Sequence, residues 1–432
     1  MRHPSELQLT DDARGHQLTN THVWTPDSRW IAYDVRPRGS TFSGETIERV
    51  SVPDGQTQCL YRAVDGACVG VVTVAPTSPE RYVFIHGPEH PDALWQYDFH
   101  HRRGVIISAE HPDVAETLDA LDITPPYTPG ALRGGSHVHV FSPDASRLSF
   151  TYNDHVMHED CPERDQRNVG VALSGASVRS AKSHPREYDG SHFCVLVTHT
   201  TPAPRPGSDD ITRAYEEGWV GHRGYLKPDG LRQRWALAFI GDTLSEDGQR
   251  VPELFIVDLP EEDSAYRQAG ASPLQGTEST LPAPPAGVSQ RRLTFTHSRR
   301  YPGLATLPRH WVRSAPDGGS LAFLMRDDNG VVQLWRVSPN GGELRQVTHG
   351  GYDVQSAFNW HPDGRSVLMV MDNSVVRCDV ASGAVTRITE RTAQPPCADA
   401  VIPSPDGRWV AYMREVNGWA QIFVARLTTD DE

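Results

Sequence analysis

The sequence lacks the features that mark several large classes of protein. Its six cysteines are scattered without a CxxC pair, which argues against a zinc knuckle or a disulfide framework and predicts reduced thiols. No stretch is long and apolar enough to cross a membrane, and the N-terminus has neither the apolar region nor the small-residue cleavage site of a secreted chain. We therefore expect a cytoplasmic protein without a membrane partner.

Positive charge is also scarce. Lysine occurs twice, as Lys182 and Lys227, and the formal net charge is −14. Because phosphate binding depends on a basic face, this balance argues against nucleic acid as a partner. Arginine supplies nearly all the positive charge, and two interpretations stay open. One is codon bias, and the other is that some guanidinium groups form forks that bind carboxylates.

The motifs of common catalytic sites are missing as well. The chain contains no GxSxG elbow, no HExxH and no GxxxxGK[ST] loop. These absences exclude a serine peptidase in which a propeller gates a hydrolase domain. Any chemistry must come from side chains that the fold itself brings together.

What the sequence does contain is a recurring Pro-Asp turn between two apolar strands. The copies lie at residues 21–34, 136–154, 310–327, 358–372 and 400–414. In each copy Pro presets φ and Asp can bond its own backbone, which predicts a hairpin. The prolines of the last three copies, Pro316, Pro362 and Pro405, are 46 and 43 residues apart. This period fits the four short strands of a propeller blade.

We therefore predict an all-β fold, a seven-bladed β-propeller that forms a single domain over residues 1–432. The last blade shows three strands, and we expect the N-terminal segment 15–20 to complete it. We also expect a strand at residues 94–101 and short helices at 114–123 and 211–219. The predicted blades span residues 21–62, 66–110, 135–182, 190–296, 308–348, 354–390 and 398–427.

Alignment of the blades on their Pro-Asp turns identifies candidate residues at one mouth of the central channel. Because side chains at i and i+2 of a strand point to one side, His137 and His139 are predicted to face together and to chelate one divalent ion. His22 and His310 occupy related positions in their own blades and complete the predicted metal set. The other predicted mouth residues are Asn20, His192, Gln355 and Asp399 for substrate, and Arg309 beside His310.

Other histidines are set aside because they lie in turn-like contexts and are expected to be exposed. An imidazole-rich mouth with Asp, Gln and Arg neighbours suits a divalent ion in octahedral N/O coordination, such as manganese, better than a thiolate site does. The histidines set aside are His90, His100, His101, His158, His184 and His349.

The chain resembles two known groups of propellers. Its Pro-Asp blades look like TolB-type repeats, and residues 206–221 and 308–343 are similar to the YidR-type family of bacterial propellers. A weaker resemblance, carried by SHVHVFSPD at residues 136–144 and by Thr21-His22, reaches the oligogalacturonate lyases. Those lyases have a Gln three residues before their HxH, where this chain has Gly134, and their histidines lie one residue further from the turn.

The lyase resemblance implies a metal-dependent lyase that cleaves an acidic oligosaccharide by β-elimination. In this hypothesis the ion binds a uronate carboxylate and acidifies the adjacent C–H, and Arg309 either binds the carboxylate or acts as the base. The alternative is a non-catalytic TolB-like propeller that binds a protein or a small ligand. Hydrolysis or isomerisation at the same metal site is a third possibility.

Overall fold

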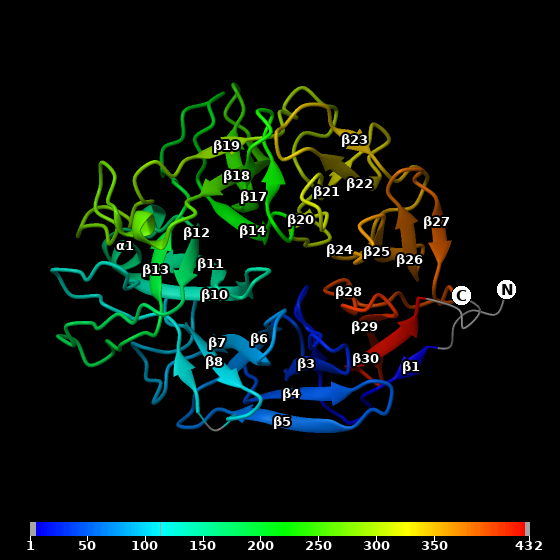
Figure 1. Ribbon diagram of the computed structural model, residues 1–432, viewed down its shortest axis with the longest axis horizontal. Coiled ribbons are helices and arrows are strands. Elements are labelled where there is room, and N and C mark those ends of the chain that lie inside the picture. The colour runs from blue at the N-terminus through cyan, green and yellow to red at the C-terminus, as the bar shows by residue number, and fades with distance from the viewer. Residues whose placement is uncertain (1–5, 113, 428–432) are drawn as a thin grey trace.

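The computed structural model describes residues 6–112 and 114–427. It is an all-β, seven-bladed propeller, as predicted, in which seven four-stranded antiparallel sheets surround a central axis (Figure 1). All six cysteines are free thiols. No helix in the described part of the chain has the length and apolar character that a membrane span needs.

The first three blades follow the chain from its N-terminal region. Blade 1 consists of β2 (His16–Gln17), β3 (Trp30–Val35), β4 (Thr46–Ser51) and β5 (Thr57–Arg62). Blade 2 consists of β6 (Val69–Val74), β7 (Arg81–His86), β8 (Arg103–Ser108) and β9 (Glu116–Thr117). Blade 3 consists of β10 (Gly134–Phe141), β11 (Arg147–Asp154), β12 (Asn168–Leu173) and β13 (Phe193–Leu196). Between β11 and β12 lie the helix α1 (His155–Asp160) and the 3₁₀ turn η1 (Pro162–Arg164).

The remaining four blades complete the ring. Blade 4 consists of β14 (Ala214–Trp219), β17 (Trp235–Leu244), β18 (Arg250–Leu259) and β19 (Gln290–Arg292), with a small hairpin of β15 (Tyr225–Leu226) and β16 (Arg232–Gln233) and the 3₁₀ turn η2 (Asp263–Arg267). Blade 5 consists of β20 (Arg313–Ser314), β21 (Leu321–Arg326), β22 (Val332–Val337) and β23 (Arg345–Gln346). Blade 6 consists of β24 (Asn359–Trp360), β25 (Ser366–Met371), β26 (Ser374–Asp379) and β27 (Val385–Arg387). Blade 7 consists of β28 (Val401–Pro403), β29 (Trp409–Val416), β30 (Trp419–Arg426) and β1 (Leu7–Gln8).

The five Pro-Asp turns share one hydrogen-bond pattern. In each turn the Asp carboxylate accepts the backbone N–H two residues later, as between Asp363 Oδ1 and Arg365 N at 2.7 Å. The residue after Asp adopts φ between 57° and 76°, whether it is glycine, as at Gly364, or Ser28 or Ala145. We call the face of the ring that carries these turns the turn face, and the opposite face, where the innermost strands begin, the loop face.

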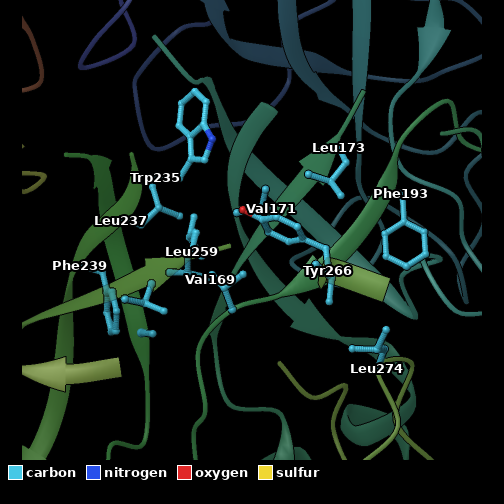
Figure 2. Close-up of a cluster of buried hydrophobic side chains, with 14 of the residues drawn as sticks. Val169, Val171, Leu173, Phe193, Trp235, Leu237, Phe239, Leu259, Tyr266 and Leu274 are labelled. Carbon is cyan, nitrogen blue, oxygen red and sulfur yellow. The ribbon is translucent and has the colours of Figure 1, made fainter. Parts of the chain in front are cut away.

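Blades pack against one another through their apolar sheet faces. Figure 2 shows one such cluster between blades 3 and 4, in which Val169 and Val171 of β12 lie near Leu237 and Phe239 of β17. These side chains are almost completely buried. The alternation of apolar residues along each strand supplies a buried face to both neighbouring blades, and the ring replaces a single central core.

The ring closes with an N-terminal strand, as predicted, but the strand is not the predicted segment 15–20. Leu7 and Gln8 of β1 pair with Val424 and Phe423 of β30, whereas His16 and Gln17 pair with β3 in blade 1. Figure 1 shows β1 beside β30. The earlier segment reaches the outer edge of the last blade, and the predicted segment is already used as the innermost strand of blade 1.

Parts of blades 2 to 4 also differ from the predictions. Residues 94–101 form bends instead of a strand, and residues 114–123 form no helix but contribute β9 and buried loop residues. Residues 211–219 contain β14, the innermost strand of blade 4, instead of a helix. Consequently His192 precedes the outermost strand of blade 3 and does not open the innermost strand of blade 4, so the predicted fourth blade begins too early.

Candidate functional site

The strand with the HxH motif is bulged, which separates its two histidines. The β10–β11 register shifts between His137 and Val140, and Val138 adopts a left-handed φ of 53°. His137 contacts the Thr151 hydroxyl at 2.8 Å, while His139 Nε2 lies 2.9 Å from the Ser136 hydroxyl. A bulge changes the alternation of side chains along a strand. The prediction that both imidazoles face together is therefore wrong.

The other two predicted metal ligands have different surroundings. His310 Nε2 accepts a hydrogen bond from Leu324 N at 3.1 Å, and its Nδ1 lies 3.3 Å from the Pro308 carbonyl oxygen, so both ring nitrogens have backbone partners. His22 borders the channel, where burial and then the charge of Arg313 lower its pKa to about 4. The structure gives the four predicted histidines no common ligand position, and their metal role stays a prediction.

The remaining predicted residues are dispersed. The Asn20 side-chain oxygen accepts a hydrogen bond from Arg313, Gln355 Nε2 donates to Asn373 Oδ1 at 3.1 Å, and Asp399 is exposed. His192 is buried, and burial lowers its pKa to about 4. No hydrogen bond or ion pair among the described residues joins two of these four, and their roles in substrate binding stay predictions.

Arg309 lies in the segment that leads into β20 from the loop face. Its Nε donates to Glu216 Oε1 at 2.7 Å and its Nη2 to Glu216 Oε2 at 3.3 Å. The guanidinium also lies over the Trp311 ring at 4.5 Å. Burial, followed by the charges of Arg102, Arg167 and Arg309, holds the pKa of His137 well below its ordinary value. The structure thus brings His137 and Arg309 into one electrostatic environment.

Arg102 and Arg167 form the cationic centre of this mouth. Their guanidinium carbons lie 5.1 and 5.4 Å from the centroid of the Phe99 ring, which is 56% exposed. Their side-chain partners are neutral: Arg102 Nη1 donates to Tyr97 Oη, and Arg167 Nε donates to Asn153 Oδ1, both at 3.1 Å.

The charges of these two arginines are incompletely neutralised. Among the residues that the structure describes, neither forms an ion pair with a carboxylate within 4.0 Å. Burial, followed by repulsion from Arg213 and Arg102, lowers the pKa of Arg167 to about 10. An anionic ligand placed between Arg102 and Arg167 would relieve this repulsion.

A histidine and aspartate group adjoins the arginines. Potential ligand atoms of His100, His158 and Asp165 all lie within 4.8 Å of one another, and this is the only such group of three or more found in the described ranges. His100 Nε2 lies 2.7 Å from Asp165 Oδ2, and the imidazoles of His100 and His158 stack with centroids 4.0 Å apart. Asn153 connects this group to the arginine cluster, because its Nδ2 donates to Asp165 Oδ2 at 2.9 Å.

The donor set fits a divalent cation. Two imidazoles and one carboxylate are the ligands of the facial triad, which leaves coordination positions open for substrate. Burial opposes protonation of His100, but hydrogen bonds to Asp165 and Asp98 raise its pKa to about 9, so an ion would have to displace this proton. Asp98 Oδ1 lies 3.5 Å from His100 Nδ1 and is placed to orient the ring.

Two loops build this site, and a glycine on β10 lets the first of them lie close to that strand. The loop between β7 and β8 carries Phe99 and His100, while the loop between β11 and β12 carries His158 and Asp165. A Cβ atom at Gly135 would lie 2.2 Å from the Phe99 carbonyl oxygen, so a larger residue there would push the first loop away from β10.

The expectation that His100, His101 and His158 are exposed is wrong for His100 and His101, which are 7% and 9% exposed; His158 is partly exposed. The order of the strands in the sequence could have indicated that these histidines lie together. Both loops join the second and third strands of adjacent blades, so they had to emerge on the same face.

The fold and this mouth together define the class of protein: a seven-bladed propeller with a candidate metal and anion site on its loop face. The comparison with known sequences defines the family. The chain is 60% identical to "Uncharacterized protein YidR" of Escherichia coli (strain K12) over 95% of both chains, and it belongs to the family of that protein. Residues 68–188 match a family described as "Protein of unknown function (DUF3748)".

Solved structures show the likeness in fold. An oligogalacturonate lyase in complex with manganese aligns with a TM-score of 0.56 at 11% identity and covers 99% of both chains. The oligogalacturonate lyase of Vibrio parahaemolyticus aligns with a TM-score of 0.59 at 9% identity, over 99% of this chain and 95% of that one. The family membership and the lyase-like fold expected from the sequence are thus confirmed.

Proposed function

We propose that the loop-face mouth is the active site of a metal-dependent lyase that cleaves an acidic oligosaccharide by β-elimination. The observation that carries the proposal is the meeting of the His100, His158 and Asp165 group with Arg102 and Arg167 at one mouth. A manganese-containing lyase with the same overall fold supports it. His100, His158 and Asp165 would hold the ion, which would polarise a bound carboxylate and acidify the neighbouring C–H.

The protein's own groups supply binding and proton transfer. Arg102 and Arg167 bind substrate carboxylates, and the exposed Phe99 ring beside them offers a surface for an apolar sugar face. The guanidinium of Arg309 is a fork of donors of the kind that binds carboxylates, as its pairing with Glu216 shows, so of its two predicted roles we favour carboxylate binding over that of base.

His137 is the candidate base. Because its pKa lies well below the ordinary value, its imidazole is neutral at pH 7 and a ring nitrogen can accept the proton. The electrons of the broken C–H bond form the new C=C bond, and the glycosidic oxygen at the next carbon leaves with its bonding pair. The product is an unsaturated uronate.

The proposal is tested by incubating the metal-loaded protein with oligogalacturonides and following the absorbance of the unsaturated product. We expect turnover that is lost in His158→Ala and reduced about 100-fold in kcat by His137→Gln. The control is His349→Ala, an exposed histidine in blade 5, which should leave turnover unchanged. If the wild-type protein binds no metal and forms no unsaturated product, the lyase proposal fails and a binding propeller remains.

A further inference from the structure

A large cavity lies on the turn face, opposite the candidate metal site. It has a volume of about 1090 Å³ and is lined by residues from the second half of all seven innermost strands. Its rim includes prolines of the Pro-Asp turns, such as Pro26, Pro143 and Pro316. Its volume lies slightly above the range of about 300–1,000 Å³ that is typical of small-molecule sites. The proposed lyase chemistry uses none of the residues that line it.

Three tryptophans of the wall are fixed by the same kind of hydrogen bond. The indole N–H groups of Trp24, Trp219 and Trp360 each donate at 3.1 Å to a backbone carbonyl in the innermost strand of the preceding blade. The acceptors are Ile402, Val140 and Arg313. Because these bonds occupy the indole donors and hold the rings in place, the tryptophans offer the cavity rigid apolar surface.

The charges at the cavity are mainly positive. Arg234 has carboxylate partners, Asp144 and Glu261, each at 3.5 Å. In contrast, Arg223, Arg232 and Arg313 have no carboxylate within 4.0 Å among the described residues. Arg313 Nε is buried and without a hydrogen-bond partner in that same set, while Arg223 and Arg232 are exposed at the rim.

This local excess of guanidinium groups occurs in a chain with a net charge of −14. Guanidinium groups pair with carboxylates and sulfonates, and indole faces pack against flat apolar groups. We propose that the turn-face cavity is a second binding site, specific for a small organic anion with a flat, apolar body. The anionic group pairs with Arg313 and the body packs among Trp24, Trp219 and Trp360.

The test uses two fluorescent probes of similar shape that differ in charge. 1-Anilinonaphthalene-8-sulfonate carries the anion, and N-phenyl-1-naphthylamine lacks it. We expect the sulfonate to bind at one site per chain, as measured by fluorescence and calorimetry. Arg313→Gln should weaken sulfonate binding about tenfold, the value of roughly one charge-assisted hydrogen bond, and should change binding of the neutral probe less than about twofold.

Arg309→Gln is the matched control, because it removes the same charge at the opposite mouth, and we expect it to leave both affinities unchanged. Should Arg313→Gln fail to fold, the double variant Arg223→Gln/Arg232→Gln changes only exposed rim residues and should still weaken sulfonate binding about threefold. Binding of the sulfonate at several weak sites, or equal effects of the variants at both mouths, would overturn the proposal.

The experiment is independent of the lyase proposal. Chelation of metal with EDTA and the variant His158→Ala should leave sulfonate binding unchanged, because both act on the loop face. A protein without lyase activity that still binds the sulfonate through Arg313 would retain the turn-face site. Loss of sulfonate binding on chelation would assign the probe to the metal site and contradict a separate cavity site.

Discussion

Glu216 and Glu217 are neighbours on β14, but the strand bulge gives their carboxylates different surroundings. The register of β14 shifts between Tyr215 and Gly218, and Glu216 adopts a left-handed φ of 55°. Glu216 pairs with Arg309, whereas Glu217 is 1% exposed and its burial raises its pKa to about 7. One residue therefore belongs to the mouth and the other to the packed interior.

Glu217 should make the stability of the fold depend on pH. Its carboxyl stays protonated in the folded state after the unfolded chain has ionised, so stability should fall as pH rises from the ordinary value of 4.5 toward about 7. Between pH 5 and pH 8 the free energy of unfolding, measured with urea, should fall by roughly 2 kcal/mol less in Glu217→Gln than in the wild type. Glu261→Gln, at a 65% exposed side chain, is the control. An equal pH dependence in wild type and Glu217→Gln would contradict the assignment.

Single residues also decided which site predictions failed. Val138 is β-branched, and such residues seldom adopt positive φ. The local sequence therefore does not indicate the bulge that separates His137 from His139. His100 and Asp165 are 65 positions apart, and their 2.7 Å contact depends on the folding of two loops. Residue type and spacing along one strand could not predict either result.

At the scale of elements, helix α1 is held by a buried ion pair. Asp154 caps the helix by accepting Met157 N at 2.8 Å, and its other oxygen accepts from Arg133 Nη2 at 2.8 Å. Arg133 also donates to the carbonyl oxygens of Thr277 and Thr280 in the long loop after η2. This contact connects the helix that carries His158 to the insertion of blade 4.

Breaking this pair should be costly. Arg133→Leu leaves a buried carboxylate without its cation, and we expect a loss of about 3 kcal/mol of unfolding free energy. The same variant should weaken metal binding, because α1 loses its support. Arg164→Leu is a suitable control, since its ion pair with Asp160 is half exposed and should contribute less than about 0.5 kcal/mol. A stability of Arg133→Leu equal to that of Arg164→Leu would disprove this role.

The elements themselves were predictable where the pattern was local and repeated. All five Pro-Asp copies form the hydrogen-bonded turn that their Asp predicts. The helix predicted at residues 211–219 is wrong because AYEEGW shows no clear alternation of apolar and polar residues. The bulge in β14 accounts for this missing alternation. Tertiary pairing with β17 determines that strand, and this pairing leaves little trace in the sequence.

At the scale of the whole molecule, closure depends on the N-terminal segment. Leu9 N donates to Ile422 O at 2.8 Å beyond the paired residues of β1, and the Leu9 side chain is 6% exposed. Glu6 accepts hydrogen bonds from Tyr412 and Arg414 of β29. These contacts cover the edge of β30, which would otherwise be free to pair with another chain.

A charge at this closure should open the ring. We expect Leu9→Asp to lower the midpoint of thermal unfolding by several degrees, because it removes a buried apolar side chain and buries a carboxylate, and to increase self-association in light scattering. Leu231→Asp, at a 67% exposed position, should do neither. If the two variants behave alike, closure through β1 does not limit stability.

The sequence repeat was sufficient to predict the propeller and its closure by an N-terminal strand, but it was not sufficient to predict the residues of the site. Propeller sites are built from loops of several blades, and the repeat says little about loops. The most direct measurement is therefore a calorimetric titration of the chelator-treated protein with Mn²⁺. We predict one ion per chain in the wild type and in His139→Ala, and none in His158→Ala or Asp165→Asn. Binding that survives in His158→Ala but is lost in His139→Ala would contradict the account.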